Sequence, residues 1–343
     1  MSVGAFGPGR VNLIGEHTDY NDGLCLPFAI ERGVTVRADA LGGARVHAHA
    51  DDLGEDDDFA AAGLVPSQAD GWRAFVRGTV GELRAAGHDV GGARLRIAGD
   101  LPRGSGLSSS AALSTALALA LLALTGADEG DRRELARLCS RVENDWVGAQ
   151  TGLLDQLAAL FGQPGHALRL DCRDLSIEPV PLDLRGWTLA VVDSGHAHVH
   201  AGSGYNDRPA ECRAACAALG VATLRDADAG AAARLPAPLD RRVRHVLREN
   251  ARVDAAVAAL RAGDLPALGE LLDASHASLR DDYEVSVDAV ERTVLRLKDA
   301  GAAGARIVGG GFGGSVLALF PPDVAPPADA TVVRPGGAAR VLG

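Results

Sequence analysis

The sequence predicts a protein of mixed helices and strands that is divided into two domains. The chain has 343 residues, which is longer than a single compact domain usually is. Short apolar runs punctuated by glycine and proline dominate the first 50 residues, whereas helical spacing dominates the second half. The pattern changes near Pro179–Pro181, so we place a first domain at residues 1–180 and a second at residues 181–343.

The composition narrows the classes of function. The formal net charge of −11 opposes a nucleic-acid surface, because such a surface needs concentrated basic residues. The longest apolar stretch, Ala111–Leu124, contains Ser114 and Thr115 and is too short to span a bilayer. The first residues lack the pattern of a secretion signal, and the five cysteines form no C-x-x-C pair. We therefore expect reduced thiols, a cytoplasmic location, and neither nucleic-acid nor membrane partners.

The first half of the chain predicts strands followed by helices. Two apolar runs, residues 34–38 and 44–48, predict a hairpin-like pair of strands around Gly42–Gly43. The acidic run Asp51–Asp58 predicts a solvated loop. The spacing of apolar residues then predicts a helix over 72–86, a strand over 93–98, an apolar helix that ends near 125–126 and is buried on all sides, and a helix over 131–147.

The second half predicts mainly helices. A strand is expected over 187–193, and the periodicity that follows predicts helices over 206–219, 239–262, 264–280 and 287–300. A glycine loop then separates two strand-like runs, 305–308 and 315–320.

Two glycine-rich segments are candidates for ligand binding. Gly104–Ala112 runs directly into the apolar helix, and a glycine-rich turn before a helix directs free backbone N–H groups at one point, where an anion can bind. An ordinary serine N-cap is the alternative. Gly309–Gly314 contains more glycines than a tight turn needs, which indicates close approach by a ligand or by another backbone segment, with a plain hairpin loop as the alternative.

Neither of the two common nucleotide-binding loops fits. A Walker A loop needs a Gly-Lys-Ser/Thr sequence, and the only lysine, Lys298, lies in an expected helix away from such a pattern. The dinucleotide fingerprint G-x-G-x-x-G fails because Ser109 stands where the third glycine should be. P-loop enzymes and Rossmann dehydrogenases are therefore disfavoured.

Polar side chains are unusually dense in Gly9–Asn21. Carboxylates there can accept hydrogen bonds from sugar hydroxyls while arginine and histidine donate, so the stretch suits hydroxyl recognition. Composition alone leaves a polar surface loop as the alternative.

This stretch resembles the galactokinase signature of the GHMP kinase family. Other motifs of the family follow in the expected order: Pro102–Ala112 resembles its ATP-phosphate loop, Gly152–Gln156 its catalytic aspartate segment, Ser275–Ser286 a stretch typical of galactokinases, and Gly309–Ser315 its third motif. The resemblance implies an α+β fold in two domains, an N-terminal domain like the second domain of ribosomal protein S5 and a ferredoxin-like C-terminal domain, with the active site between them.

The resemblance also implies an activity, transfer of the γ-phosphate of ATP to the anomeric hydroxyl of galactose with Mg²⁺ as cofactor. Asp155 would take the proton from the hydroxyl and Arg10 would lie beside it; a helix-capping aspartate is the alternative for Asp155. The residues implied to bind the sugar are Glu16, His17, Thr18, Asp19, Gly152 and Tyr205. Those implied to bind ATP are Gly104, Ser105, Gly106, Leu107, Ser108, Ser109 and Ser110. Ser110 and Glu143 would hold the metal, although Glu143 could also be a solvent-facing helix residue, and Trp72 could lie near the adenine or in the core.

Two features depart from the family pattern. The family usually carries a glutamate before the tyrosine near residue 205, whereas this chain reads Ser203-Gly204-Tyr205. Upstream, His196, His198 and His200 alternate, so on a strand they could meet a transition metal, although we prefer a polar strand end or loop.

Two rival functions stay open at the level of sequence. One is a GHMP kinase for another sugar, such as N-acetylgalactosamine or arabinose. The other is a non-catalytic sensor that binds sugar and ATP; such sensors resemble galactokinases with a shortened phosphate loop. The phosphate loop is intact here at Ser110–Ala112, which favours catalysis.

Overall fold

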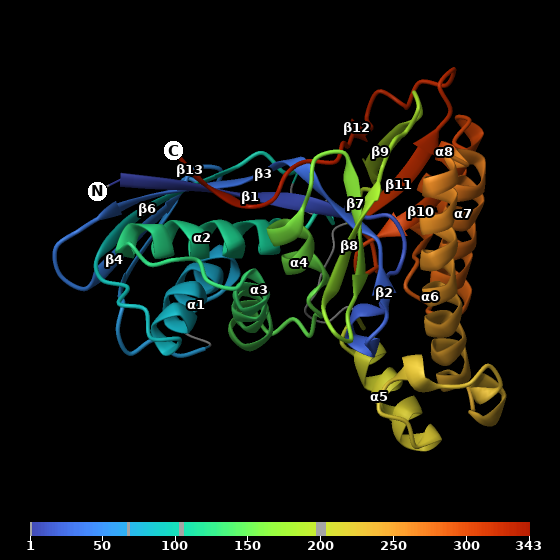
Figure 1. Ribbon diagram of the computed structural model, residues 1–343, viewed down its shortest axis with the longest axis horizontal. Coiled ribbons are helices and arrows are strands. Elements are labelled where there is room, and N and C mark those ends of the chain that lie inside the picture. The colour runs from blue at the N-terminus through green and yellow to red at the C-terminus, as the bar shows by residue number, and fades with distance from the viewer. Residues whose placement is uncertain (1, 67–68, 103–105, 197–203) are drawn as a thin grey trace.

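The computed structural model of the protein describes residues 2–66, 69–102, 106–196 and 204–343 (Figure 1). A large sheet and its helices form one end of an elongated molecule, and a smaller sheet with long helices forms the other (Figure 1). The mixture of segregated sheets and helices confirms the α+β class. Among the described residues, no helix is both long and apolar enough to cross a membrane.

The large sheet has the strand order β13-β1-β3-β6-β4-β5. Its strands are β1 (Ser2–Asn12), β3 (Pro27–Ala40), β4 (Arg45–Ala50), β5 (Glu55–Ala60), β6 (Ala93–Gly99) and β13 (Arg340–Leu342). Buried and exposed residues alternate along β4 and β6, as they do in a sheet with one face on the core. Strand β13 brings the C-terminal residues back beside β1 at the N-terminus (Figure 1).

The predicted hairpin between residues 34–38 and 44–48 is wrong. Strand β6 lies between β3 and β4, with Val36 opposite Ile97 and Ala48 opposite Leu95. The alternating apolar residues of β6 fill the centre of the sheet, so β3 and β4 pair with β6 rather than with each other. Nothing local to the Gly42–Gly43 turn indicates this, because the intervening strand comes about fifty residues later in the chain.

The prediction of a solvated loop over Asp51–Asp58 is also wrong in its second half. Residues from Glu55 onward form the edge strand β5, in which Asp57 and Phe59 are buried. The guanidinium of Arg77 bridges both carboxylate oxygens of Asp57, at 2.9 and 2.6 Å. Charged residues are common on edge strands because they discourage pairing with other chains, and here arginine partners compensate their charge.

Helices cover one face of the large sheet. They are α1 (Gly71–Ala85), α2 (Ser109–Thr125), α3 (Arg132–Arg141) and α4 (Leu154–Phe161). Every residue of Ala111–Leu122 is buried, which confirms that α2 is apolar and enclosed on all sides. The helix predicted over 131–147 is interrupted, because its last turn is the π-helix η2 (Val142–Val147), which ends at Gly148 with φ of 87°. Such π turns are frequent at functional sites.

The second sheet has the order β10-β11-β9-β12 and is packed with long helices. Its strands are β9 (Thr188–Asp193), β10 (Gly304–Val308), β11 (Ser315–Phe320) and β12 (Thr331–Val332), and its helices are α5 (Asp207–Leu219), α6 (Leu239–Ala262), α7 (Leu265–Asp281) and α8 (Asp288–Asp299). All four predicted helices and the strands predicted over 187–193, 305–308 and 315–320 are therefore confirmed to within a residue or two.

A small third sheet, β2-β7-β8, lies between these two regions (Figure 1). Its strands are β2 (Leu24–Cys25), β7 (His166–Asp171) and β8 (Ser176–Pro181), and short 3-10 turns complete the chain at η1 (Asp19–Asn21), η3 (Leu224–Asp226) and η4 (Ala231–Arg234). The boundary between residues 180 and 181 falls at the end of β8. We keep the two-domain division as a proposal, with β13 belonging to the first domain because it pairs with β1.

Candidate active site

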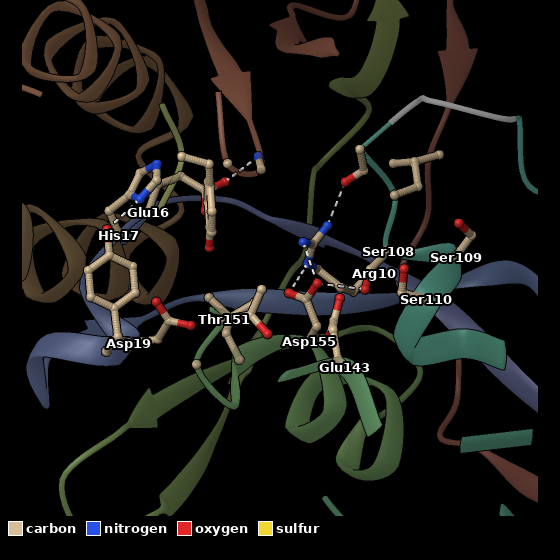
Figure 2. Close-up of a pocket in the computed structure, with 18 of the residues that line it drawn as sticks. Arg10, Glu16, His17, Asp19, Ser108, Ser109, Ser110, Glu143, Thr151 and Asp155 are labelled. Carbon is tan, nitrogen blue, oxygen red and sulfur yellow. Dashed lines mark hydrogen bonds and ion pairs between the residues drawn. The ribbon is translucent and has the colours of Figure 1, made fainter. Parts of the chain in front are cut away.

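A cavity of about 280 Å³ lies where the loop after β1, the start of α2 and the start of α4 meet (Figure 2). The loop after β1 contributes Glu16, His17, Asp19 and Tyr20 to the wall. The start of α2 and the residues just before it contribute Gly106–Ser110, and the start of α4 contributes Asp155. The wall also includes Arg10, Glu143, Thr151, Gly152, Tyr205, Gly309 and Gly310. Segments that are far apart in the sequence thus form one polar site.

An arginine–carboxylate pair forms the centre of the cavity. Arg10, at the end of β1, donates from Nε to Asp155 Oδ1 at 2.6 Å and from Nη2 to Asp155 Oδ2 at 2.7 Å. The Ser108 hydroxyl donates to Asp155 Oδ2 at 2.6 Å, and Arg10 Nη1 donates to the carbonyl of Gly106 at 2.6 Å (Figure 2). Burial acts to lower the pKa of Arg10, but the neighbouring Asp155, Glu16 and Glu143 outweigh it and raise that pKa. Asp155 is thereby held in one orientation at the junction of the two loops.

The start of α2 offers hydrogen-bond donors to an anion. Ser108 has the left-handed φ of 58° and no side-chain cap, so its hydroxyl is free to bind Asp155 while the first N–H groups of α2 stay without helical partners. The chain before it is tied to β1, because Arg10 N donates to Leu107 O at 3.0 Å. Gly106, Leu107, Ser108, Ser109 and Ser110 all line the cavity, as predicted for the phosphate loop, whereas Gly104 and Ser105 lie outside the described residues.

Glu143 enters the cavity from the π turn η2 beside α2. It is 8% exposed, and Gln156 Nε2 donates to its Oε2 at 2.8 Å. Burial and the negative charge of Asp155 raise the pKa of Glu143 to about 7, against the opposing effects of Gln156 and Arg10. A buried carboxylate with too little positive charge around it is suited to a cation. The Ser110 hydroxyl lines the same part of the cavity, so the oxygen ligands expected for Mg²⁺ are brought together (Figure 2).

Asp19 and Gly152 meet on the opposite side of the cavity. A Cβ added to Gly152 would collide with the carboxylate of Asp19, so only glycine leaves room for Asp19 there. Burial, followed by the charges of Asp155 and Glu16, raises the pKa of Asp19 to about 7. Glu16 is held more firmly, since its Oε1 accepts from Gly309 N at 2.8 Å and lies 3.0 Å from Arg306 Nη2.

His17 and Tyr205 complete the same wall. The two rings lie 5.7 Å apart between centroids, and both side chains are buried. Burial raises the pKa of the Tyr205 hydroxyl well above its usual range, and the charges of Asp19 and Asp155 add to the shift. The phenol is therefore neutral. The glutamate that the family usually carries before this tyrosine is absent here. Gly204, which precedes Tyr205, has a left-handed φ of 78°.

Thr18, which was predicted to contact the sugar, does not line the cavity. Its side chain is fully buried, and its hydroxyl lies within hydrogen-bond distance of the carbonyls of Gly15 and Leu24, at 2.9 and 2.8 Å. The hydroxyl therefore braces the turn from which Glu16, His17 and Asp19 project. The motif is continuous in sequence, but the tight turn directs this one side chain inward.

A second cleft of about 280 Å³ adjoins the start of α2. It shares Ser109 and Ser110 with the polar cavity and is otherwise largely apolar, with Trp72, Phe75 and Leu113 in its wall. The indole of Trp72 is partly buried, and its Nε1 donates to Glu55 Oε2 at 3.0 Å. An apolar cleft next to an anion site has the form needed for an aromatic base attached to phosphates.

Residues that the sequence did not single out hold the loop after β1 in place. Arg306 is fully buried and donates to the carbonyls of Asn12 and Leu13 at 3.0 and 2.8 Å. Glu249 accepts from Gly15 N at 2.9 Å, and His245 Nε2 lies 3.0 Å from Glu16 O. These partners are more than 200 residues from the loop, so no local spacing could reveal them.

The histidine cluster falls mostly outside the described residues. His198 and His200 are not described, and His196 is an exposed residue whose carbonyl accepts from Gly314 N at 3.0 Å.

Comparisons with known proteins agree with this geometry. A family model described as the galactokinase galactose-binding signature matches residues 2–39, and those of the GHMP kinases N terminal domain and the GHMP kinases C terminal match residues 74–163 and 256–334. A galactokinase from Mycobacterium tuberculosis is 46% identical, over 97% of this chain and 93% of its own length. The chain belongs to the galactokinase family of the GHMP kinases. A family member from Roseiflexus is 45% identical over 91% of this chain and 82% of its own length.

Solved structures of the family share the same fold. The structure of Lactococcus lactis galactokinase complexed with galactose matches with a TM-score of 0.92 and 33% identity, over 99% of this chain and 95% of that one. Methanococcus jannaschii mevalonate kinase matches with a TM-score of 0.68 over 98% of each chain but only 15% identity, which shows a common fold alone. The predicted GHMP kinase fold is therefore confirmed. As a member of the galactokinase family, the chain belongs to the ATP-dependent sugar kinases.

Proposed function

We propose that this protein transfers the γ-phosphate of ATP to the anomeric hydroxyl of galactose, giving galactose 1-phosphate and ADP. The Arg10–Asp155 pair carries the proposal, because it stands between a wall rich in hydroxyl-binding groups and a helix N-terminus suited to phosphates. The galactokinase relatives and the galactose-bound structure of the Lactococcus enzyme support the choice of sugar. The need for ATP supports the expected cytoplasmic location.

Galactose would occupy the side of the cavity formed by the loop after β1. The carboxylates of Glu16 and Asp19 accept hydrogen bonds from sugar hydroxyls, and His17 and Tyr205 offer further polar contacts. Because residue 152 is glycine, the Asp19 carboxylate can lie directly against the backbone of the opposite wall. The sugar would therefore lie with one hydroxyl toward Asp155.

ATP would occupy the other side. Its phosphates would bind the N–H groups and hydroxyls of Gly106–Ser110, and its adenine would enter the apolar cleft beside Trp72. Both clefts share Ser109 and Ser110, so one nucleotide can span them. This placement brings the γ-phosphate toward Asp155 and the sugar.

Ser110 and Glu143 would hold Mg²⁺, the cofactor that this enzyme family implies. The unfavourable burial of the Glu143 carboxylate fits a cation site, since a bound cation would restore its ionised form. Bound there, the ion would neutralise negative charge on the phosphates during transfer.

The transfer itself requires little covalent chemistry from the protein. Asp155 accepts the proton of the anomeric hydroxyl. At the same time the oxygen of that hydroxyl forms a bond to the γ-phosphorus, and the bond from this phosphorus to the ADP oxygen breaks. Arg10 keeps Asp155 oriented and favours negative charge near the attacking oxygen. Ser108 fixes the second carboxylate oxygen, so that Asp155 has one orientation toward the sugar.

A coupled ADP-release assay with a panel of sugars tests the proposal. We expect release with galactose and none with 1-deoxygalactose, which lacks the hydroxyl that is phosphorylated. Release with N-acetylgalactosamine or arabinose but not galactose would assign a different sugar. Binding of galactose and ATP without any ADP release would instead identify a sensor.

A further inference from the structure

A chain of hydrogen bonds leads from the cavity toward the helices of the second half. His17 Nδ1 lies 2.7 Å from the Tyr20 hydroxyl, which lies 2.9 Å from the Tyr283 hydroxyl, which in turn lies 3.1 Å from the sulfur of Cys212. His17 and Tyr20 line the cavity, whereas Tyr283 is fully buried behind them and Cys212 is 2% exposed. Together with Asn21, we call these residues the His17 relay.

The protonation of His17 decides what its other ring nitrogen offers to a ligand. Burial lowers the pKa of His17 well below its usual range, and electrostatic interactions with His245 and Arg208 add to this, against an opposing effect of the Gly310 backbone. The imidazole is therefore neutral and carries one proton. Nε2 is buried and makes no hydrogen bond of normal geometry within the described part of the chain. It is a donor if the proton is on Nε2 and an acceptor if the proton is on Nδ1.

Asn21 sets the direction of the relay at its far end. Its Nδ2 donates to the carbonyl of His17 at 3.0 Å, which identifies that amide atom as nitrogen, because a carbonyl can only accept. The same nitrogen lies 3.6 Å from the sulfur of Cys212, so the sulfur accepts there. Burial raises the pKa of the Cys212 thiol, which keeps its proton and can donate to Tyr283.

The remaining contacts then follow in one direction. Burial raises the pKa of Tyr20 and of Tyr283 well above the usual range, so each hydroxyl keeps its single proton. Tyr283 donates to Tyr20, and Tyr20 donates to His17 Nδ1. In the opposite direction, the Cys212 sulfur, which is a weak acceptor, would have to accept hydrogen bonds from both Asn21 and Tyr283. The Tyr20 phenol would then no longer donate to the imidazole nitrogen of His17, although that pairing is strong.

We propose that the His17 relay holds the neutral imidazole with its proton on Nε2, so that His17 donates a hydrogen bond to an oxygen of the sugar. Tyr283 and Cys212 are then positioning residues for substrate recognition. That the ligand is a sugar rests on the proposed function. The donor complements Glu16 and Asp19, which as carboxylates only accept, since each sugar hydroxyl both donates and accepts.

Nitrogen NMR of the ligand-free protein tests the position of the proton. With histidine labelled by ¹⁵N, and with the signals of His17 identified by their loss in His17→Gln, we expect a proton on Nε2 and none on Nδ1 at pH 7. A proton on Nδ1, or on both nitrogens, would overturn the proposal. The spectrum needs no sugar. The predicted proton position can therefore be wrong although galactose is phosphorylated, and it can be right although the ADP-release assay with galactose is negative.

Variants at the buried end of the relay test its effect on the sugar. Tyr283→Phe and Cys212→Ala should give mixed protonation of His17 and raise the KM for galactose by about tenfold, the effect of losing roughly one hydrogen bond, while kcat changes less than about twofold. Cys212→Ser keeps a donor at the same place and should retain the wild-type spectrum and KM. Unchanged spectra and KM in Tyr283→Phe would overturn the proposal. If Tyr283→Phe does not fold, equal changes of the His17 spectrum and of KM in Cys212→Ala and Cys212→Ser would overturn the proposal.

Discussion

Two kinds of carboxylate surround the cavity, and they differ in how their charge is compensated. Asp155 receives two hydrogen bonds from Arg10 and one from Ser108. Glu143 receives one from the neutral amide of Gln156, and Asp19 faces Asp155 and Glu16 rather than a cation. The pKa values of Glu143 and Asp19 are both raised to about 7, with burial as the largest cause.

This difference separates groups that are complete in the free protein from groups that a ligand completes. The contacts of Asp155 already fix its orientation, as a group that reacts directly needs. Glu143 and Asp19 have acceptor oxygens that a cation and sugar hydroxyls can satisfy, and either ligand would favour the ionised form. The free protein thus holds unfavourable negative charge where its substrates would bind.

Removing the compensated carboxylate should have the largest effect. In Asp155→Asn the amide keeps the shape of the side chain but cannot take the proton, so kcat should fall on the order of 10² or more while galactose binding stays within a few-fold. Steady-state kinetics with titration of galactose measures both. The surface variant Asp183→Asn is the control. A kcat within tenfold of wild type would remove Asp155 from the role of base.

Changing Glu143 should act mainly through the metal. Glu143→Gln removes the charge assigned to Mg²⁺, so the Mg²⁺ concentration at half-maximal activity should rise by about tenfold or more, with little change in galactose binding. A Mg²⁺ titration of activity provides the measurement, and the exposed Glu134→Gln on α3 provides the control. An unchanged midpoint would contradict the assignment.

The two uncompensated carboxylates should also make stability depend on pH. Their folded pKa of about 7 lies above the values near 4 expected for the unfolded chain, so the folded protein binds more protons between about pH 4 and 7. Their contribution therefore favours folding at the acidic end of this window and is lost as pH rises to 7. The loss should be on the order of 1 to 2 kcal/mol per group after allowance for partial exposure.

The double variant Asp19→Asn/Glu143→Gln isolates this effect. The free energy of unfolding is measured with urea at pH 5 and at pH 8. The part of its decrease from pH 5 to pH 8 that Asp19 and Glu143 cause should be absent from the variant, since all other titrating groups are shared with the wild type. Equal differences in the two proteins would mean that the raised pKa values are wrong.

The sequence predicted the long helices and most of the residues that line the cavity, because both depend on patterns among neighbouring residues. The periodicity of 239–262 corresponds to α6, and Glu16, His17 and Asp19 of the dense polar motif line the cavity. It could not predict the insertion of β6 between β3 and β4 or the inward turn of Thr18. Strand order and side-chain direction depend on contacts between distant segments, which a local pattern does not contain.

The supporting network was beyond sequence reasoning for the same reason. Tyr283 lies in the stretch Ser275–Ser286, which is typical of galactokinases, but no local pattern indicates its link to His17 through Tyr20. Cys212 gave no signal, because a cysteine without a partner at characteristic spacing suggests no role. Only the packing of α5 against the loop after β1 reveals it.

The smallest effect is expected from the alternating histidines. In the proposed transfer, Ser110 and Glu143 hold the cation, which leaves no chemical step for a metal at His196, His198 and His200. We therefore predict that the triple alanine variant keeps kcat and KM within about twofold of wild type. Three imidazoles that bound a metal would need to be neutral and convergent, and a chelator or their substitution would then remove it. Elemental analysis of protein purified without an affinity tag checks this directly. A stoichiometric transition metal that disappears in the triple variant, together with activity, would show that the histidines form a site and that the carboxylates are not sufficient.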